Sequence, residues 1–484
     1  MQMSFLKQNP WKSILYIFCV LALLGVFATL TGINLENQVI MAYDEARHGV
    51  SAYEMIRNDD WLIHTYQDEP DFWNLKPPFS FWAIALNFKL FGYHSVALRL
   101  HSAIATAILL LWITLWAKKR YGIALSLLML LFLVINPALY GQNFARRGEA
   151  DAMHTLFFTI SMLCLLNSKE NFRWLYGSAF GFGLSFMTKS YHSALIPLIC
   201  FLFLLCTGEI RKLTWRRCLW LIFWGFLPIA PWAIARYLRE GPSFFIEMIV
   251  TDIFARVSPE HTEPFSWTFY LFFLQANHTI FVCLWLSLGA VVLQCVKKRR
   301  FFLSRSQILL LLWIAVPLVL YSFSSFKLYH YILPITIPFS IAGALASRMI
   351  FRHIKPLWIK SVLALLLAIG MIFQLNLDFQ AVLAAADTGS LQASLIEALD
   401  RDLDGGKHIY IQYDKGRTVW MQNDMLRSLL SGDVICIDGG IEAFVEDEEP
   451  SLLVIFKSEM DYDLLEENDI YYDSTYYYIL ENGY

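Results

Sequence analysis

Long apolar runs that carry almost no charge are the feature that most limits how this chain can fold. The clearest runs are 14–30, 103–116, 195–206, 309–323 and 361–373. With their flanks, several approach the roughly 20 residues that a helix needs to cross the hydrocarbon core of a membrane. Lipid offers no hydrogen-bond partner to backbone N–H and C=O groups, so such runs must be helical. Only 16% of the residues are charged, against about 25% in soluble domains, which excludes a soluble globular protein.

Basic residues follow a regular pattern between the apolar runs, and this pattern predicts their orientation. Clusters such as Lys118-Lys119-Arg120 and Arg348 with Arg352 follow alternate runs, and Lys and Arg favour cytoplasmic loops. The pattern predicts a multi-pass α-helical protein of the cell membrane with about 11–13 transmembrane helices and a cytoplasmic N-terminus. The first run lacks the small-residue cleavage site of a signal peptide, so we expect it to be retained. The expected spans are 12–33, 97–117, 122–140, 152–167, 174–188, 191–207, 218–235, 267–295, 307–324, 329–346 and 357–376.

Two large segments and the tail fall on the outer side in this topology. Residues 1–379 would form the transmembrane domain, with outer loops at 34–96 and 236–266. The tail, 380–484, is acidic and less apolar, and it predicts a small soluble α/β domain outside the membrane. Its segments 409–413 and 452–456 are typical of buried strands, and 470–472 with 476–480 is typical of a hairpin.

The cysteines and the charge distribution indicate neither a redox centre nor a nucleic-acid partner. All of the cysteines lie in or beside apolar runs except Cys436, which lies in the tail. The sequence holds no Cys-x-x-Cys metal pattern and no basic nucleic-acid motif. We therefore interpret the cysteines as small hydrophobic residues in helix packing.

The first outer segment holds the strongest candidates for chemistry. Asp44 and Glu45 precede a helical stretch just above the predicted membrane surface. They could favour the positive end of that helix, or one could act as a general base; the residues alone leave both roles open. Lys76, before Pro77-Pro78, stands at a helix N-terminus, where its charge opposes the helix dipole. It therefore needs an anionic partner, which is either one of the two acids or a bound phosphate.

More polar residues recur at the same predicted depth. Each alone is more often an interfacial anchor than a functional group. Together they place carboxylates and cations at one level, where cations suit a lipid phosphate and a carboxylate suits deprotonation of a hydroxyl. These residues are Arg146, Arg147, Glu149, Asp151, Lys189, Arg256, His261, Glu263, Lys327, His330 and Tyr331.

An ordered set of motifs resembles one glycosyltransferase superfamily. Asp44-Glu45-Ala46-Arg47-His48, followed by Asp60-Trp61-Leu62, is similar to the "DEARYA…GDWL" opening of the polyprenyl-phosphate-sugar transferases of GT-C fold. That superfamily includes the protein O-mannosyltransferases and the lipid A aminoarabinose transferase. Further motifs match in order over residues 41–340: Lys76-Pro77-Pro78, Phe88–Gly92, Arg99–Ala103, Ala145–Asp151, Thr188-Lys189 and Lys327–Pro334.

The resemblance implies an inverting transfer from a polyprenyl-phosphate-linked sugar to an envelope lipid, glycan or protein at the outer face. It implies that Asp44 is the general base and Asp151 a second acid, with Glu45 beside them. It also implies that Lys76, Arg256, Lys327 and Lys189 hold the donor phosphate. We expect Tyr43, Arg47, His48, His330 and Tyr331 to contact substrate. One base and a cationic clamp suffice for this chemistry, so we expect no required cofactor and assign no metal ligands.

Three departures from the motifs affect the details of this expectation. Leu75 replaces the acid before Lys-Pro-Pro, Ser190 replaces a glycine and His101 replaces a proline. Two other functions compete with the transferase. A flippase of lipid-linked saccharide would place its site near the bilayer midplane and show internal repeats, and neither pattern is found. A scaffold that only presents the tail would not need Asp44.

Overall fold

The computed structural model of this protein describes most of the membrane-embedded chain and parts of the tail. The described residues are 10–38, 40–41, 44–66, 69–141, 143–251, 268–298, 303–324, 327–385, 407–412, 435–436, 440–457, 468–473 and 477–482. Every apolar run that was predicted to span the membrane is helical. The helices are α1 (Pro10–Gly32), α2 (Asp44–Arg57), α3 (Phe79–Phe91), α4 (Ser95–Tyr121), α5 (Ile123–Val134), α6 (Asp151–Asn167), α7 (Arg173–Lys189), α8 (Leu195–Cys206), α9 (Trp215–Phe226), α10 (Ile229–Glu240), α11 (Ser243–Ile249), α12 (Phe269–Ala276), α13 (His278–Lys298), α14 (Arg305–Phe323), α15 (Thr336–His353) and α16 (Leu357–Ala384).

The helical stretches confirm a polytopic membrane protein. Within the described residues, seven stretches are long and apolar enough to cross a membrane, or eight if the bent pair α9–α10 forms one span. This number is smaller than the predicted 11–13 because several helices in the bundle are short. The shorter apolar helices are α3, α5 and α6, and α7 and α8 together count as one stretch although a 3-10 turn (Ser190–Ala194) separates them.

Two predicted spans are interrupted at residues that break a helix. The predicted span 218–235 bends by 63° between α9 and α10, where Pro228 precedes α10 and removes a backbone donor. The predicted span 267–295 divides into α12 and α13 at Asn277, whose backbone is extended. The Asn277 side chain accepts a hydrogen bond from the Ile280 N–H at 3.0 Å and so caps the new helix.

Small residues allow close helix contacts inside the bundle. A Cβ atom on Gly183 in α7 would collide with the carbonyl of Gly225 in α9 and lie 2.8 Å from the Pro228 ring. Close approach of this kind is typical of helix packing in membranes, where small residues let backbones meet. Large apolar side chains on the outer faces are instead exposed, among them Trp11, Leu238, Trp285 and Leu357, as expected for surfaces in contact with lipid.

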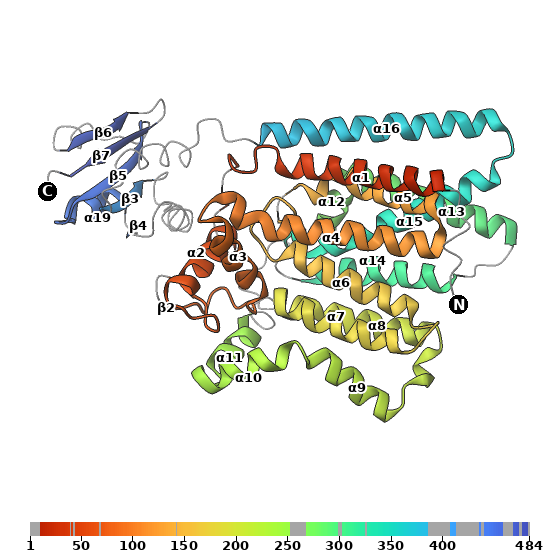
Figure 1. The fold of residues 1–484 in the computed structure, drawn as a ribbon, viewed down its shortest axis with the longest axis horizontal. Coiled ribbons are helices and arrows are strands. Elements are labelled where there is room, and N and C mark those ends of the chain that lie inside the picture. Colours follow the sequence, from red (N-terminus) through yellow and green to blue (C-terminus); the bar gives the residue numbers. More distant parts are fainter. Residues whose placement is uncertain are drawn as a thin grey trace.

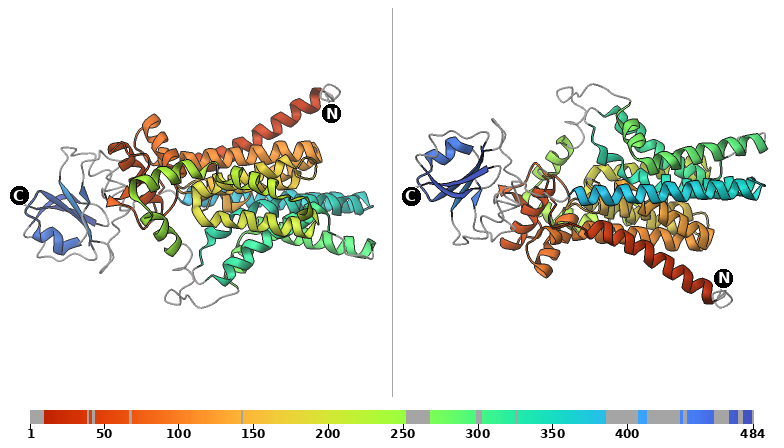
Figure 2. Two further views of the ribbon diagram at one scale, coloured as in Figure 1. Left: turned by 90° about the horizontal axis from the view of Figure 1, so that it is seen from below. Right: turned by 90° about the horizontal axis from the view of Figure 1, so that it is seen from above.

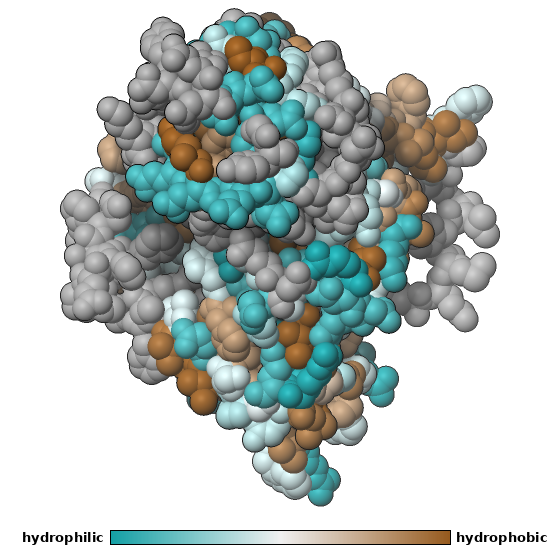
Figure 3. Space-filling model, turned by 90° about the vertical axis from the view of Figure 1, so that its left-hand side faces the viewer, coloured by the Kyte–Doolittle hydropathy of each residue, from teal (hydrophilic) through white to brown (hydrophobic). Residues whose placement is uncertain are grey.

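The helices run along one common direction, and the two ends of the bundle differ (Figures 1 and 2). The helices α2 and α3 and the C-terminal sheet lie at one end, and the N-terminus of the described chain lies at the other. Seen from the end with the sheet, the described surface is largely hydrophilic (Figure 3). The surface at this end is therefore suited to contact with water, whereas the apolar outer faces of the helices are suited to contact with lipid.

The tail contains the strands that the sequence predicted. The strands are β3 (His408–Gln412), β4 (Ile435–Cys436), β5 (Ser451–Phe456), β6 (Asp469–Asp473) and β7 (Tyr477–Glu481), in the order β4-β3-β5-β7-β6. The β3 strand pairs in parallel with β4 and β5, whereas β7 pairs antiparallel with β5 and β6. The predicted hairpin is thus present as β6–β7, and α19 (Gly440–Glu446) packs against the mixed sheet. A second, two-stranded sheet, β1 (Thr65–Tyr66) with β2 (Glu69–Pro70), lies in the segment between α2 and α3.

Candidate functional site

Asp44 and Lys76 form an ion pair at the end of the bundle that carries α2 and α3. Asp44 is the first residue of α2, where a carboxylate is favoured by the helix dipole. The Lys76 ammonium donates to Asp44 Oδ1 at 3.0 Å and to Asn74 Oδ1 at 2.9 Å. Side-chain exposure is 18% for Lys76 and 30% for Asp44, so both can be reached by a ligand. The partner of Lys76 in this structure is therefore Asp44, one of the two anions that the sequence suggested.

A second acid–lysine pair joins two helices of the bundle. Asp151 is the first residue of α6, and Lys189 is the last residue of α7. The Lys189 ammonium donates to Asp151 Oδ1 at 2.5 Å, and both side chains are buried. The same ammonium lies 5.6 Å from the ring centre of Tyr331. The α6–α7 pair therefore delivers a carboxylate, a cation and an aromatic ring to one place.

His330 and Glu149 complete what we call the Asp44 cluster: Asp44, Lys76, Glu149, Asp151, Lys189 and His330. His330 lies close enough to the two acid–lysine pairs for electrostatic interaction with all four groups. Glu149 interacts in the same way with Asp44, Asp151 and Lys189. Burial alone would raise the pKa of Asp44, but Lys76 above all, with His330, holds this pKa well below its usual range. Asp44 is thus an anion at neutral pH.

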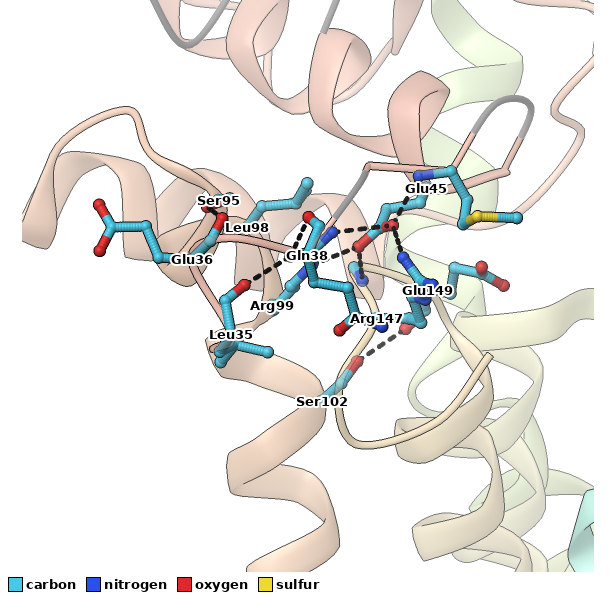
Figure 4. A network of polar contacts seen from close by, with 12 residues as sticks. Leu35, Glu36, Gln38, Glu45, Ser95, Leu98, Arg99, Ser102, Arg147 and Glu149 are labelled. Carbon is cyan, nitrogen blue, oxygen red and sulfur yellow. Dashed lines mark hydrogen bonds and ion pairs between the residues drawn. The ribbon is translucent and has the colours of Figure 1, made fainter. Parts of the chain in front are cut away.

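Glu45, the neighbour of Asp44, lies in a different environment (Figure 4). Arg99 Nε donates to Glu45 Oε1 at 2.7 Å, and Arg147 Nη1 donates to Oε2 at 3.1 Å. The backbone N–H groups of Gly148 and Met41 each donate to the carboxylate at 2.9 Å. We call Glu45, Arg99, Arg147, Gly148 and Met41 the Glu45 network. Its carboxylate is fully buried and fully hydrogen-bonded, so Glu45 holds the site together and does not face substrate.

The charges in this network decide the protonation of Glu45. Burial acts to raise the pKa of Glu45, but Arg99 and Arg147 outweigh burial and lower the pKa to about 2. Arg99 also donates to the carbonyls of Leu35 and Gln38, at 2.6 and 2.9 Å. The Glu45 network therefore ties the segment after α1, the start of α2 and the start of α4 to one carboxylate.

The loop before α6 is fixed by its own contacts. Arg146 Nη1 donates to the carbonyls of Leu30 and Thr31 in α1, at 2.7 and 2.8 Å. A Cβ atom on Gly148 would lie 2.6 Å from Leu98 Cγ in α4, so only glycine allows this approach. The His101 ring and the Ser102 hydroxyl lie 3.0 and 3.1 Å from the carbonyl of Glu149. Contacts with α1 and α4 therefore fix the loop that carries Glu149 and leads into Asp151.

His48 supports Asp44 from one turn later in α2. Its Nδ1 lies 2.5 Å from the Asp44 carbonyl. Burial lowers the pKa of His48 to about 3, so its ring is neutral and Nδ1–H is the donor in this contact. The ring stacks on Phe81 at 4.8 Å, and His64 stacks on the same phenyl ring at 4.7 Å. The aromatic stack fixes α2 against α3.

Arg47, predicted to contact substrate, and Lys327, predicted to hold the donor phosphate, are engaged in contacts within the protein. Arg47 forms two hydrogen bonds with the carboxylate of Asp71, at 2.7 and 2.8 Å, and lies over the rings of Tyr66 and Trp73. Lys327 donates to the carbonyl of Ser324 at 2.6 Å. Tyr43 and Arg256 lie outside the described residues, so their expected roles stay predictions.

Several site residues were not singled out from the sequence. Glu149 was noted only among the polar residues at the start of a predicted span, although an acid two residues before Asp151, the first residue of α6, is a usable signal. Arg99 was noted only as the start of a matching motif and no role was predicted for it, because a single arginine inside an apolar pattern resembles a snorkelling side chain. Asp71, the partner of Arg47, is visible only in three dimensions.

A separate cavity of about 620 Å³ lies between α5, α15 and α16. Its lining is mostly apolar and includes Tyr121, Leu128, Ser347 and Arg348. Tyr121 ends α4, whereas the Glu45 network lies at the start of that helix. No residue of the Asp44 cluster lines this cavity, so we place the candidate active site at the cluster and not at the cavity.

Comparison with known proteins identifies relatives for most of the membrane-embedded part. Residues 75–234 match the family model described as dolichyl-phosphate-mannose-protein mannosyltransferase. The chain is 28% identical, over 382 residues, to undecaprenyl phosphate-alpha-4-amino-4-deoxy-L-arabinose arabinosyl transferase 2 of Pseudomonas fluorescens. That match covers 72% of this chain and 64% of the relative, less than two thirds of its length. A similar transferase of Aeromonas hydrophila is 27% identical over 394 residues, covering 75% of this chain and 67% of the relative.

Solved structures share the fold at low sequence identity. The crystal structure of ArnT from Cupriavidus metallidurans bound to undecaprenyl phosphate superimposes with a TM-score of 0.70 at 16% identity, covering 96% of this chain and 98% of that one. The oligosaccharyltransferase AglB from Archaeoglobus fulgidus gives a TM-score of 0.55 at 10% identity, covering 93% of this chain and 70% of that one. The motifs, the sequence matches and the fold agree, and the chain is homologous to the polyprenyl-phosphate-sugar glycosyltransferases of GT-C fold, which include the ArnT-type aminoarabinose transferases.

Proposed function

We propose that this protein transfers a sugar, with inversion, from a polyprenyl-phosphate donor to a hydroxyl or phosphate group of an envelope acceptor. The Asp44 cluster carries this proposal, because it combines three acids and two lysines with His330 at one end of a membrane bundle. The curated relatives are named for an undecaprenyl-phosphate-linked aminoarabinose. That donor, with a lipid such as lipid A as the acceptor, is therefore the first combination to test.

The reaction would proceed as a direct displacement at the anomeric carbon of the sugar. The acceptor oxygen forms a bond to this carbon while the bond from the carbon to the phosphate oxygen breaks. The polyprenyl phosphate leaves with the electron pair and needs no protonation. If the acceptor is a hydroxyl, Asp44 takes its proton; if the acceptor is a phosphate, its oxygen is already anionic and Asp44 serves to orient it. No step requires a metal ion.

Lys76 links donor binding to the state of Asp44 in this mechanism. In the structure, the Lys76 ammonium contacts Asp44 at 3.0 Å. A donor phosphate near Lys76 would share that ammonium and neutralise part of its charge. Because Lys76 is the strongest of the groups that lower the pKa of Asp44, sharing it would make Asp44 more basic. The base is then activated when the donor is bound.

The remaining predicted residues take supporting roles in this proposal. Lys189, with Lys327 and Arg256, would stabilise the negative charge that develops on the leaving phosphate. Tyr43, Tyr331 and His330 would contact the substrates, and His48 would hold Asp44. Glu45 and Arg47 act as positioning residues, because their polar groups are engaged by Arg99, Arg147 and Asp71.

We further propose that the cluster faces the extracytoplasmic side of the cell membrane. Basic residues gather at the opposite ends of the helices, at the end of α4 and the end of α15, and such residues favour the cytoplasm. The C-terminal sheet lies at the same end as α2 and α3 (Figure 1) and would then be extracytoplasmic. A reporter fused after Asn376 is expected to be active only outside the cytoplasm.

A transporter of lipid-linked saccharide remains the competing function. It predicts a site near the membrane midplane, whereas Asp44 and Asp151 occupy the first positions of α2 and α6 at one end of the bundle. Mass spectrometry of envelope lipids and glycans from cells with the wild-type gene, without it, and with Asp44→Asn separates the two. We expect one sugar addition to disappear in the deletion and in Asp44→Asn at equal protein level. Unchanged profiles in all three strains, under conditions of expression, would refute the transferase.

A further inference from the structure

Three of the four carboxylates at the site are balanced by cations of the protein. Asp44 pairs with Lys76, Asp151 pairs with Lys189, and Glu45 pairs with Arg99 and Arg147. Glu149 is different. Among the described residues, its carboxylate contacts only an amide, Nδ2 of Asn143, and no cation. One carboxyl group at the site therefore lacks a cationic partner among the described residues.

The surroundings of Glu149 oppose its charge. The side chain is 5% exposed, and Asp44 and Asp151 lie close enough to repel its negative charge. Burial first, and then these two acids, raise the pKa of Glu149 well above its usual value, with Lys189 only partly opposing them. A cationic ligand would remove this penalty, because it would supply the missing counter-charge.

The backbone of the loop at Glu149 is fixed by contacts with neighbouring residues. The Glu149 carbonyl is held by His101 and Ser102, and the preceding Gly148 is held by Glu45. Figure 4 shows the Glu149 carboxylate pointing away from the Glu45 network, on the opposite side of the loop from Arg99. A carboxylate on such a rigid loop is suited to recognising one ligand shape, because the loop does not move to fit other ligands.

A second polar atom near the cluster also lacks a partner. His48 Nδ1–H contacts the Asp44 carbonyl, so Nε2 of the neutral ring is an acceptor. That nitrogen is buried and has no hydrogen-bond partner among the described residues, and Lys76 and Asp44 are its main charged neighbours. A ligand N–H donor that reached this nitrogen, beside Asp44 and Lys76, would satisfy it.

We propose that Glu149 is the specificity residue for a sugar that carries a positively charged amino group. The ammonium would donate to the Glu149 carboxylate beside Asp44 and Asp151, while the donor phosphate would lie toward Lys76. This inference rests on the proposed sugar transfer and names the chemical class of its donor. A divalent metal is the other cation to consider, but no group of three or more acids, histidines or cysteines in the described part of the chain is arranged to hold one.

The test compares two donors that differ by one charge. They are undecaprenyl phosphate carrying 4-amino-4-deoxyarabinose, and the same molecule with the amine formylated, which removes the charge but keeps the ring. Binding to the full-length protein in lipid nanodiscs is measured by calorimetry, with no acceptor present. We expect the wild type to prefer the charged donor by about tenfold or more, since hydrogen bonds between charged groups are among the stronger ones.

Three variants complete the experiment. Glu149→Gln keeps the shape and removes the charge, and we expect its preference to fall to about twofold or less. Glu149→Asp keeps the charge and should retain part of the preference. Glu170→Gln, which neutralises an exposed carboxylate paired with Arg120, is the matched control and should behave as the wild type. If Glu149→Gln does not fold, Glu149→Asp decides the proposal, because an unchanged preference after the carboxylate has been withdrawn by one methylene would overturn it.

The possible outcomes separate this inference from the proposed function. An equal affinity of the wild type for the two donors, or an unchanged preference in Glu149→Gln, overturns the role of Glu149 even if sugar is transferred. Loss of the preference on adding a chelator would assign Glu149 to a metal and also overturn it. A clear preference that is lost in Glu149→Gln supports the inference, and if no acceptor is then glycosylated, only the proposed transfer is refuted.

Discussion

Asp44 and Glu45 are neighbours in the chain, yet they lie in two regions with opposite properties. Glu45 is fully buried, and its carboxylate receives hydrogen bonds from Arg99, Arg147 and two backbone N–H groups. Asp44 is 30% exposed and shares one lysine with Asn74. The Glu45 network has no capacity left for a ligand, whereas the Asp44 cluster has cations and acids that a ligand can reach. Glu45, whose carboxylate has all its hydrogen-bond partners within the protein, therefore stabilises the structure of the site. Asp44, whose carboxylate has fewer partners, can interact with a ligand.

The largest expected effect comes from removing the centre of the Glu45 network. Glu45→Ala would leave Arg99 and Arg147 buried without a counter-charge, which typically costs about 3–5 kcal/mol. We expect a large drop in the thermal unfolding midpoint of the protein in detergent, together with poor membrane yield. A variant as stable as the wild type would show that the two arginines have other anionic partners.

Acid should break the same network. The pKa of Glu45 in the folded protein is about 2, below its ordinary value of 4.5. Its contribution to stability is therefore complete above about pH 4.5 and is lost as the pH falls toward 2, amounting to about 3 kcal/mol. Thermal unfolding midpoints should be constant between pH 6 and about pH 4.5 and should decrease as the pH is lowered further toward 2. The control is Glu45→Gln, whose midpoint should depend less on pH over the same range.

Lys76→Met should weaken donor binding more than it weakens the fold. One hydrogen bond from an ammonium to a phosphate contributes about 1.5–3 kcal/mol, so affinity for undecaprenyl phosphate should fall about 10- to 100-fold. The pair with Asp44 is part-exposed and should add at most about 1 kcal/mol to stability. Calorimetry and thermal unfolding on one preparation measure both effects. A change in stability without a change in affinity would move Lys76 from the Asp44 cluster to a structural role.

Arg47→Lys should have a moderate effect on stability. A lysine cannot form the two parallel hydrogen bonds that Arg47 makes with Asp71, nor stack equally well on Tyr66 and Trp73. We expect a loss of about 1–2 kcal/mol and faster proteolysis between α2 and α3. If donor binding fell with no loss of stability, Arg47 would be a substrate contact, as the sequence first suggested.

The smallest effect is expected at the opposite end of the bundle. Arg120 and Glu170 form an exposed ion pair at 3.4 Å, and pairs of this kind contribute about 0–1 kcal/mol. Arg120→Gln should therefore leave both stability and donor binding close to wild type. A strong loss of transfer in this variant would show that the chemistry is not confined to the Asp44 cluster.

The sequence predicted the helical bundle and the tail strands well, for a physical reason. Lipid forces every apolar run into a helix, and the buried strands 409–413 and 452–456 have the period of a sheet, found as β3 and β5. The number of spans was predicted less well. Short helices such as α5, with 12 residues, are apolar enough but too short to meet the length of a span.

The site was predicted only in part, because pairing is a property of three dimensions. Asp44, Lys76, Asp151 and Lys189 lie in motifs, but nothing in the chain shows that Lys76 pairs with Asp44 rather than Glu45. That choice depends on Arg99, which lies 54 residues from Glu45 in sequence. The unbalanced charge of Glu149 becomes visible only when each acid has been assigned its cation.

The most direct test of the division between Asp44 and Glu45 is sugar transfer by purified Asp44→Asn in nanodiscs, with thermal unfolding measured on the same sample. With a hydroxyl acceptor, we predict a rate lower by about 10²- to 10⁴-fold and an unfolding midpoint close to that of the wild type. Wild-type transfer by Asp44→Asn, or a loss of transfer that only follows a loss of fold, would contradict the account.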